Sequence, residues 1–421
     1  MLEYRAILPL LPLDLPDYVT LISTSALKTI HLDAGGKLML LVIDGLGGLP
    51  HLETGQTELE SARTPNLDDL ARRGVVGLSE PVGPGITPGS GPGHLALFGY
   101  DPIAGNIGRG ALSALGIGLA LAPEDVGVRL NFCTIDEDGN VADRRAGRIS
   151  TDLNHELVAE LAAIEIDGVE TEIATESQHR AVLVLRGEGL HPAIRETDPQ
   201  QIGVPPLDPI ALEPVAARTA GVLEDFLDGV RRAIGDRAPA NFVLMRGYAG
   251  LPALETLGEI YGLDPACLAS YPMYKGLATI AGMTVLDTGD TLPGQVTALK
   301  KHWEEHDFFF FHFKPTDSLG EDGDFDGKVA AIEEVDAVIP DILALGPASM
   351  VVTGDHSTPA RLGQHSWHPV PFLLHAENIV PDAAAEFGER ACGTGSLGLF
   401  PARSTMSLLA GYGGRLRKFG A

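Results

Sequence analysis

Residues 37–48, KLMLLVIDGLGG, decide the fold class. Six consecutive apolar residues, 38–43, are followed at once by Asp44 and a glycine-rich turn. A short continuous apolar run that stops in this way is typical of a strand buried on both faces of a sheet. Two later segments repeat the arrangement, DFFFFHFKPTDSLGEDGD at 307–324 and ASMVVTGDHSTP at 348–359. The sequence therefore predicts three buried strands, each with an acidic residue shortly beyond its carboxyl end.

Helical patterns lie between these strands. In the clearest one, which runs from Lys328 to Leu345, apolar residues recur at helical spacing. Strands that alternate with helices predict an α/β fold, with a mainly parallel sheet covered by helices on both faces. Ligands bind outside the carboxyl ends of the strands in such sheets. The residues that we expect at that edge are Asp44, Asp317, Asp355 and His356.

The middle of the chain has a different pattern. Residues 120–265 contain short alternating runs separated by charged turns, and none of these runs ends in an acid in the same way. A chain of 421 residues is also long enough for two domains. We therefore predict a core domain formed by residues 1–119 and 266–421, with a smaller α/β domain, residues 120–265, inserted into it.

Composition and charge exclude several classes of protein. The formal net charge of −27 argues against binding to nucleic acid or to an anionic membrane surface. No stretch approaches the ~18 consecutive apolar residues of a membrane span. Residues 1–20 lack the basic region and cleavage site of a signal peptide. The three cysteines are far apart and form no CxxC pair, which indicates buried thiols in a reducing cytoplasm.

The most unusual segment is GPGITPGSGPGHLALFGYDP, residues 83–102. It places Ser90 in a loop rich in glycine and proline, ahead of an apolar run at 94–98 that predicts a helix. A serine at such a place presents its hydroxyl near backbone N–H groups that favour an anion. The same serine can instead be a turn residue that caps the helix. Both readings stay open for Ser90 on its own, and a nucleophile elbow is ruled out because Gly89 directly precedes it.

Several candidate metal ligands follow the predicted strands. Asp355 and His356 are adjacent, and a carboxylate beside an imidazole suits a hard or borderline divalent ion. Asp317 and Glu321 supply oxygen donors four residues apart, across what we expect to be a glycine turn. Together with Asp44 and the imidazoles of His365 and His368, these groups suffice for two metal sites of the kind used in phosphoryl displacement.

One acidic segment is a competing candidate for calcium. The EF-hand loop pattern is matched by Asp322, Asp324, Asp326, Gly327 and Glu333. An EF-hand needs a helix on both sides, whereas a phenylalanine-rich strand and Pro315 precede this segment. We therefore expect a solvated acidic loop that leads into the following helix.

Basic residues that can clamp an anion are few in so acidic a chain. Three arginines, Arg144, Arg145 and Arg148, fall within five residues of one another. Further candidates are Arg180, Arg246 and Lys275. Each of them singly favours a solvated surface position, and the sequence has no GxxxxGK[ST] motif of a P-loop NTPase.

Taken in order, seven segments resemble the cofactor-independent phosphoglycerate mutases of the archaeal type, within the alkaline phosphatase superfamily. These segments span nearly the whole chain. They are LLVIDGLGGLP, ARTPNLDDLARRG, TPGSGPGHLALFGYDP, NFCTIDEDGNVADRRAGRI, YPMYKGLATIAGM, HFKPTDSLGEDGDFDGK and TGDHSTP with HSWHPVP. The resemblance implies an alkaline-phosphatase-like core and interconversion of 3-phosphoglycerate and 2-phosphoglycerate through a phosphoserine, as in glycolysis and gluconeogenesis.

The resemblance also implies roles for individual residues. Ser90 would be the phosphorylated nucleophile. One metal ion would be bound by Asp44, Ser90, Asp355 and His356, and the other by Asp317, Glu321 and His365. Relatives often have histidine at the position of Glu321, so the metal preference is open: Mn²⁺ is expected, with Co²⁺, Mg²⁺ or Zn²⁺ as alternatives and no 2,3-bisphosphoglycerate. The residues that match substrate-binding segments are Arg144, Arg246, Lys275 and, more weakly, Arg180.

Other functions stay open at this point. Some relatives of this family are homoserine kinases, and a metal-dependent phosphatase or phosphomutase can use the same core. A non-catalytic metal-binding relative is disfavoured by the presence of both Ser90 and a full ligand set. We expect a small phosphorylated substrate and a cytoplasmic location, without nucleic acid or membrane. The oligomeric state is open, and a homo-oligomer is compatible with the sequence.

Overall fold

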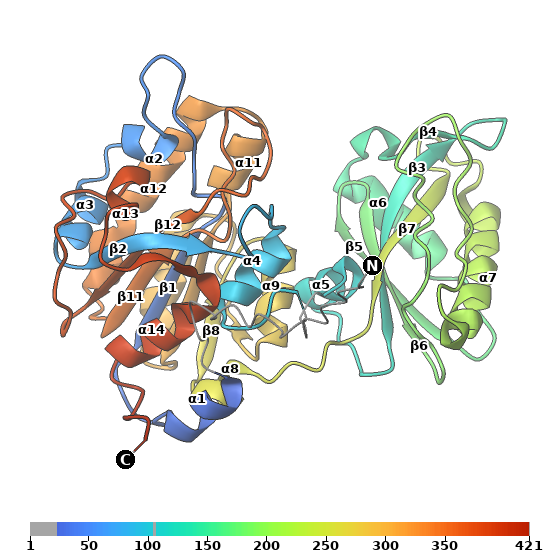
Figure 1. Cartoon of the computed structure of the whole chain (residues 1–421). Helices are drawn as coiled ribbons and strands as arrows, with labels where there is room; N and C mark the ends of the chain where they lie inside the picture. Colours follow the sequence, from blue (N-terminus) through green and yellow to red (C-terminus); the bar gives the residue numbers. More distant parts are fainter. Residues whose placement is uncertain (1–22, 104–106, 421) are drawn as a thin grey trace, which may run out of the picture.

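The computed structural model describes residues 23–103 and 107–420. The predicted absence of a signal peptide concerned residues 1–20, which lie outside these ranges. Within them the chain forms two lobes, each built around its own sheet (Figure 1). No helix of the described part is long and apolar enough to cross a bilayer.

The larger lobe contains an eight-stranded sheet with the order β13-β2-β12-β11-β1-β10-β8-β9. Five of its seven strand pairs are parallel, and both antiparallel pairs involve β12. The strands are β1 (Leu38–Ile43), β2 (Val75–Glu80), β8 (Pro265–Leu268), β9 (Thr284–Val285), β10 (Phe308–Phe313), β11 (Ser349–Thr353), β12 (Val370–Ala376) and β13 (Gly398–Pro401). The predicted α/β fold with a mainly parallel sheet is confirmed.

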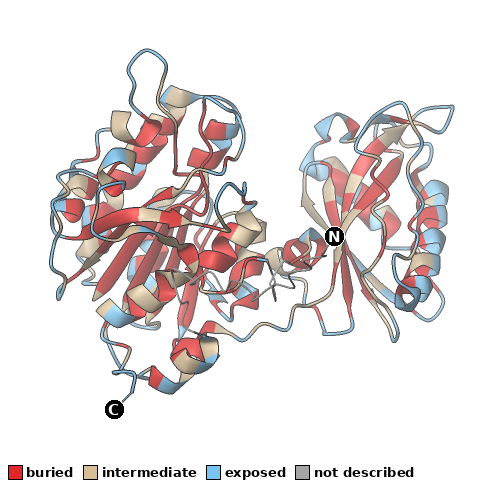
Figure 2. Ribbon diagram, viewed as in Figure 1, coloured by how far each residue is buried: buried red, intermediate tan, exposed pale blue. Residues whose placement is uncertain are grey.

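Helices cover both faces of this sheet. Leu40 of β1 and Phe310 of β10 pack into one hydrophobic core, whereas Leu41 and Phe311 pack into another on the opposite face. The first core includes α4 (Ser90–Leu97), α5 (Arg109–Gly116), α8 (Leu257–Tyr261), α9 (Pro272–Ile280) and α14 (Thr405–Tyr412). The second includes α2 (Glu58–Ser61), α3 (Pro65–Arg72), α10 (Leu292–His302), α12 (Phe325–Leu343) and α13 (Glu389–Cys392). Burial on both faces explains the uninterrupted apolar runs of these strands (Figure 2).

The register of the three central strands brings their carboxyl ends to one edge. Leu41 of β1 lies beside Phe311 of β10 and Val352 of β11. The chain therefore leaves all three strands at the same level, and Asp44 follows β1 there directly. Helix α11 (Pro315–Glu321) starts at this edge, two residues after β10 ends.

Two predicted elements differ in their bounds from the structure. The helix expected at 328–345 is α12, which begins at Phe325 because the Asp324 side chain caps it by accepting a bond from the Gly327 amide. The glycine turn expected between Asp317 and Glu321 is wrong, because both residues lie on α11. Pro315 favours the start of that helix. Backbone hydrogen bonds from the Asp322 amide to Ser318 and from the Asp324 amide to Leu319 span Gly320, and they offset the low helix propensity of glycine.

The smaller lobe is an antiparallel sheet with two long helices on one face. Its strands are β3 (Val126–Ile135), β4 (Val141–Asp143), β5 (Glu170–Ser177), β6 (Arg180–Arg186) and β7 (Phe242–Ala249). Helices α6 (Thr151–Leu161) and α7 (Ala217–Ile234) share its core. All five strands fall between residues 120 and 265, whose boundaries as an inserted domain stay a prediction. Helix α5 contacts both this sheet and α9, and so joins the two lobes (Figure 1).

The remaining small features complete the description. A short helix, α1 (Thr24–Ile30), packs near α8. Three 3₁₀ turns lie at Ala146–Arg148, Pro214–Ala216 and Ala402–Ser404. The cysteines are free and buried in the core, as predicted.

Candidate metal centre and anion pocket

The first ligand group forms where β1 and β11 end. Asp44 follows β1, and Asp355 and His356 follow β11, the neighbouring strand. The Nε2 atom of His356 lies 3.3 Å from Oδ1 of Asp44 and 3.2 Å from Oδ2 of Asp355. All three side chains are fully buried. The predicted meeting of these residues at one sheet edge is thus seen in the structure.

Ser90 reaches this group from α4, a helix that packs on one face of the large sheet. Helix α4 begins at Ser90, so the helix starts four residues earlier than the apolar run suggested. Gly89 is the cap residue, so the reading of Ser90 as the cap is wrong. Its Oγ atom lies 3.1 Å from Nε2 of His356. Helix α4 can approach so closely because residue 93 is glycine: a Cβ there would lie 2.4 Å from the carbonyl oxygen of Asp355.

A second group lies beside the first. It consists of Asp317, His356 and His365, whose ligand atoms lie within 4.8 Å of one another. The Nε2 atom of His365 is 3.4 Å from Oδ1 of Asp317 and 3.6 Å from Oε1 of Glu321. The Glu321 side chain is 54% exposed, whereas that of Asp317 is 2% exposed. Glu321 therefore lies at the open rim of this group and Asp317 at its buried base.

The other candidate ligands do not join either group. His368 lies beside Trp367, and its Nδ1 is 2.9 Å from Oγ of Ser366. In the acidic segment after α11, Asp324 caps α12 and Glu333 accepts from the Arg63 amide. The metal-competent clusters among the described residues do not include that acidic segment. Asp326, Gly327 and Glu333 lie on α12, so the segment does not form the 12-residue loop of an EF-hand.

The two groups have the chemistry of a divalent-cation site. Oδ1 of Asp44 and Oδ2 of Asp355 are buried and accept no hydrogen bond. Buried carboxylate oxygens without donors are costly, and a cation would satisfy them. Carboxylates mixed with imidazoles suit Mn²⁺, Co²⁺ and Zn²⁺ well and Mg²⁺ less well. The residues present therefore fit the two metal ions that the sequence implies.

Burial and neighbouring charges together set the protonation states of these ligands. Burial opposes ionisation of Asp44, but Lys314 and His312 hold its pKa well below the usual range. Burial also holds the pKa of His356 well below its usual value, so its imidazole is neutral. Burial, together with repulsion from Asp44, raises the pKa of Asp355 to about 6.

Lys314 and Tyr274 are two site residues that sequence reasoning missed. The Nζ atom of Lys314 lies 3.2 Å from Oδ2 of Asp44 and forms an ion pair with Asp317. Burial would lower the pKa of Lys314, but Asp44 and Asp317 raise it above its usual value. The Tyr274 hydroxyl donates to Asp44. Lys314 lies directly after β10, so the rule that ligands bind at the carboxyl ends of parallel strands also predicts a place for this lysine in the site.

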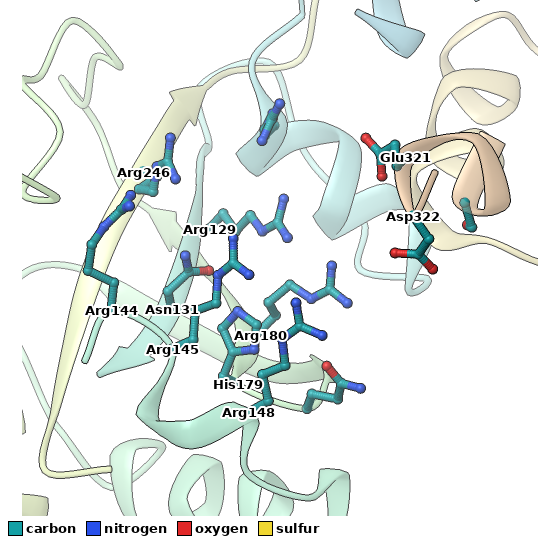
Figure 3. Close-up of a pocket in the computed structure, with 13 residues that line it drawn as sticks. Arg129, Asn131, Arg144, Arg145, Arg148, His179, Arg180, Arg246, Glu321 and Asp322 are labelled. Atoms are coloured by element: carbon teal, nitrogen blue, oxygen red, sulfur yellow. The ribbon is translucent and has the colours of Figure 1, made fainter. Parts of the chain in front are cut away.

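A cavity of about 520 Å³ opens between the two lobes next to these groups (Figure 3). The smaller lobe and α5 contribute its basic side chains, and α11 with the residue after it contributes the opposite wall. The arginines are Arg109, Arg129, Arg144, Arg145, Arg148, Arg180 and Arg246, and the opposite wall is Ser318, Glu321 and Asp322. Because Glu321 lines the cavity and lies 3.6 Å from His365 of the second ligand group, the two sites are continuous.

The arginines differ in how far they are already paired. Arg144 makes a double hydrogen bond to Asp198, and Arg246 lies 3.4 Å from the same carboxylate. Arg129 lies 3.5 Å from the buried Glu176. Within the described ranges, no carboxylate lies within 4.0 Å of the four remaining arginines, which are Arg109, Arg145, Arg148 and Arg180. These four positive charges make the cavity a candidate anion site in an otherwise acidic chain.

The pKa of His179 reflects both its burial and this positive potential. It is 8% exposed and lies within the arginine cavity. Burial and then the charges of Arg180 and Arg145 lower its pKa to about 4. Its imidazole is therefore neutral at pH 7.

Lys275 is the one predicted basic residue that lies elsewhere. It lines a separate hollow with Leu119 and Leu251. It follows Tyr274 on α9, and one residue along a helix turns the side chain by about 100°. Since Tyr274 points at Asp44, Lys275 points away. The structure thus brings Arg144, Arg180 and Arg246 together but not Lys275.

Arg109, Arg129, Asn131 and His179 also line the cavity and were missed. Arg129 and Asn131 lie two residues apart on β3, so they share a face of the sheet. Two polar residues at alternate positions of a largely apolar strand are the signal from which these two cavity residues could have been predicted. Arg109 follows a glycine at the start of α5, with no pattern that marks it.

Comparisons with known proteins identify the family of this chain. Residues 71–240 match the family model described as 2,3-bisphosphoglycerate-independent phosphoglycerate mutase. A protein of Thermus thermophilus with the name "Probable 2,3-bisphosphoglycerate-independent phosphoglycerate mutase" is 50% identical over 94% of this chain and 98% of its own. A protein of the same name from Aquifex aeolicus is 47% identical over 92% of this chain and 97% of its own.

Two solved structures have a similar fold. The cofactor-independent phosphoglycerate mutase of Thermoplasma acidophilum is 30% identical, with a TM-score of 0.69 over 89% of this chain and 99% of that one. The PH0037 protein of Pyrococcus horikoshii is 28% identical, with a TM-score of 0.80 over 92% of this chain and 100% of that one. With half of its residues identical to a relative over nearly their whole lengths, this chain belongs to the family of 2,3-bisphosphoglycerate-independent phosphoglycerate mutases.

Proposed function

We propose that this enzyme interconverts 3-phosphoglycerate and 2-phosphoglycerate, with Ser90 as the nucleophile. The observation that carries the proposal is the position of Ser90 Oγ, 3.1 Å from a histidine that belongs to both ligand groups. A cavity with four arginines free of acidic partners in the described ranges adjoins these groups. A nucleophile, a cation site and an anion site in continuity suit transfer of a phosphoryl group on a small carboxylate.

Two divalent ions complete the proposed site. Asp44, Ser90, Asp355 and His356 would hold one, and Asp317, Glu321 and His365 the other. When bound, the ions lower the pKa of the attacking hydroxyl and balance the charge of the phosphoryl oxygens. Mn²⁺ is the proposed ion, with Co²⁺, Mg²⁺ or Zn²⁺ as alternatives.

The residues of the chain then act in two symmetrical half-reactions. Ser90 Oγ forms a bond to phosphorus while the bond from phosphorus to the 3-oxygen of the substrate breaks. The hydroxyl proton of Ser90 is lost, and the departing oxygen gains a proton. Bound glycerate then turns, and its 2-oxygen loses its proton and forms a bond to phosphorus. The bond between phosphorus and Ser90 Oγ breaks at the same time, and Oγ regains a proton. No water is consumed, so the site must exclude it.

The arginine cavity would hold the glycerate between the two steps. Free guanidinium groups bind a carboxylate through paired hydrogen bonds. Arg145 and Arg148 are suited to this role because no acid within the described ranges occupies them. Arg180 adds positive charge, and its guanidinium group already donates to Tyr271 and Ser177. These arginines would retain glycerate while its hydroxyls exchange places, which is the step that distinguishes a mutase from a phosphatase. We further propose that the enzyme works in the cytoplasm, in glycolysis and gluconeogenesis.

A coupled assay tests the proposal. With Mn²⁺ present, the protein should convert 3-phosphoglycerate alone into 2-phosphoglycerate, detected through enolase. The competing homoserine kinase activity would require homoserine and ATP and would release ADP. Phosphorylation of homoserine without conversion of 3-phosphoglycerate would overturn the proposal, and release of inorganic phosphate alone would indicate a phosphatase.

A further inference from the structure

Lys328 is a fully buried lysine close to the ligand groups, and it does not line the arginine cavity. It lies on α12, near the start of the helix. Its Nζ atom donates to the carbonyl oxygens of Gly45 at 2.9 Å, Gly47 at 3.2 Å and Thr358 at 2.8 Å. Three acceptors use all three N–H donors of an ammonium group, whereas a neutral amine has only two. Burial lowers the pKa of Lys328 from its usual value, and Glu58 acts against that shift. The three acceptors match the charged form of the lysine.

These three carbonyls belong to the two loops that carry the ligands. The first loop lies between β1 and α2 and includes residues 44–49, and the second lies between β11 and β12 and includes residues 355–360. The loops also bond to each other, because the Thr358 amide donates to the carbonyls of Gly45 and Gly47. Lys328 thus ties together two loops that are adjacent in space but roughly 300 residues apart in sequence.

Glu58 makes the complementary set of bonds. This buried carboxylate lies 4.0 Å from Nζ of Lys328. It accepts from the Leu49 amide at 3.2 Å and from the Ala360 amide at 2.7 Å, and these amides belong to the same two loops. Gly48 must be glycine for this approach, because a Cβ there would lie 1.9 Å from Oε2 of Glu58. Lys328 therefore binds the carbonyls and Glu58 the amides of one pair of loops.

The pair is connected to both ligand groups through short paths. Gly45, which accepts from Lys328, also donates its amide to Oδ1 of Asp355 at 3.2 Å. Thr358, which also accepts from Lys328, donates its hydroxyl to Oδ1 of Asp317 at 2.6 Å. The same hydroxyl lies 2.9 Å from Nδ1 of His356. A shift of either loop would therefore move ligands of both metal ions at once.

We propose that Lys328, paired with Glu58, is a positioning residue that holds the two loops at the spacing both metal sites require. This inference rests on the proposed two-metal function and assigns no contact between Lys328 and the substrate. Residues behind metal ligands typically change metal affinity by about 10- to 100-fold when they are replaced. The geometry requires Lys328 to affect both ions together, since it ties the loop of Asp44 to the loop of His356 and Thr358.

The test compares Mn²⁺ binding by the full-length protein with and without the ammonium group of Lys328. Lys328→Met keeps the length of the side chain and removes the charge and the donors. Titration of the metal-stripped protein, followed by calorimetry and by the Mn²⁺ resonance signal, should show about a tenfold or greater loss of affinity at both sites. Ile339→Ala, which opens a cavity further along the same helix, is the control for a loss of stability alone. It should lower the melting temperature without changing Mn²⁺ affinity.

A double variant separates positioning from burial of charge. Lys328→Met leaves Glu58 buried without a counter-charge, which is destabilising in itself. Glu58→Gln added to Lys328→Met should recover part of the melting temperature but none of the metal affinity. Unchanged Mn²⁺ affinity in a folded Lys328→Met protein would overturn the proposal. Wild type that binds no Mn²⁺ would instead overturn the proposed function.

A measurement on wild type keeps the proposal testable if the variants do not fold. Lys328 should hold the loops in place before any metal binds. The amides of Leu49, Thr358 and Ala360 should therefore exchange slowly with deuterium in the metal-stripped enzyme. Fast exchange of these amides that becomes slow only with Mn²⁺ would show that Lys328 does not hold the loops in place before metal binds.

Discussion

Ser90 and His356 are 266 residues apart in sequence, yet Oγ of Ser90 lies 3.1 Å from Nε2 of His356. Both residues are fixed by the structure around them. Ser90 is the first residue of α4, and His356 is fully buried beside β11. The rigid scaffold on both sides means that the hydroxyl is held against the ligand groups before substrate arrives, as productive phosphoryl transfer requires.

Replacing Ser90 with alanine should abolish mutase turnover and leave the fold intact. The substitution removes one half-buried oxygen, and such changes outside the core alter stability by about 0.5 kcal/mol or less. Loss of a covalent nucleophile lowers kcat by about 10³-fold or more. The enolase-coupled assay measures the first effect and thermal unfolding the second. Retained activity in Ser90→Ala would remove Ser90 from the mechanism.

Much of the larger lobe could be predicted because its decisive signals are local. The apolar run of β1 has the predicted bounds, 38–43, and its burial on both faces of the sheet explains why the run is unbroken. The meeting of Asp44 with Asp355 followed from the general rule that parallel strands end at one edge. These predictions required no knowledge of how distant side chains pack.

The parts that could not be predicted depend on the direction in which side chains point. Lys275 and Tyr274 are neighbours on α9, and only the packing of that helix decides which of them faces Asp44. Arg109 and Arg129 come from different elements and meet only because α5 packs against β3. The role of Lys328 was also hidden, since a lysine near the start of a helix usually faces solvent.

Removing metal should stop the reaction reversibly and also lower stability. A chelator should strip both ions, and Mn²⁺ should restore activity with two ions bound per chain. A ligand that binds only the folded state at about 100 times its Kd adds about 2.7 kcal/mol of stability. Melting temperature measured against Mn²⁺ concentration should therefore rise as the sites fill. Full activity after exhaustive chelation would contradict metal dependence.

Glu321 and Asp317 should differ in their importance for the second ion. Asp317 is buried and also bonded to Thr358, whereas the Glu321 side chain is half exposed. Asp317→Ala should abolish binding of one ion. Glu321→Ala should lower the affinity for the same ion by a smaller factor. Glu321→His exchanges a hard oxygen donor for an imidazole, so it should shift preference from Mn²⁺ towards Co²⁺ or Zn²⁺. Calorimetric titrations with each ion measure these changes, and equal losses in both alanine variants would contradict the ranking.

Arg145 and Lys275 offer a matched test of the anion cavity. Arg145 lines the cavity without an acidic partner among the described residues, and Lys275 faces a separate hollow. Loss of a hydrogen bond to a charged group costs about 1.5–3 kcal/mol, so Arg145→Ala should raise KM by about tenfold or more. Lys275→Ala should leave KM for 3-phosphoglycerate unchanged. A large effect of Lys275→Ala would restore the sequence-based assignment of Lys275 to the substrate site.

His179 should titrate far below an ordinary histidine and respond to anions in the cavity. Burial and then Arg180 and Arg145 lower its pKa to about 4, whereas an unfolded histidine titrates near about 6.5. Because the folded pKa is the lower one, stability from this group is complete above about pH 6.5 and is lost as pH falls towards 4. A bound anion would offset the arginine charges and raise the pKa of His179. Imidazole NMR signals followed against pH, with and without 3-phosphoglycerate, measure both effects. Arg145→Ala should raise the pKa of His179 in the absence of ligand, and a pKa near about 6.5 in the free wild-type enzyme would show that the cavity lacks the positive potential assigned to it.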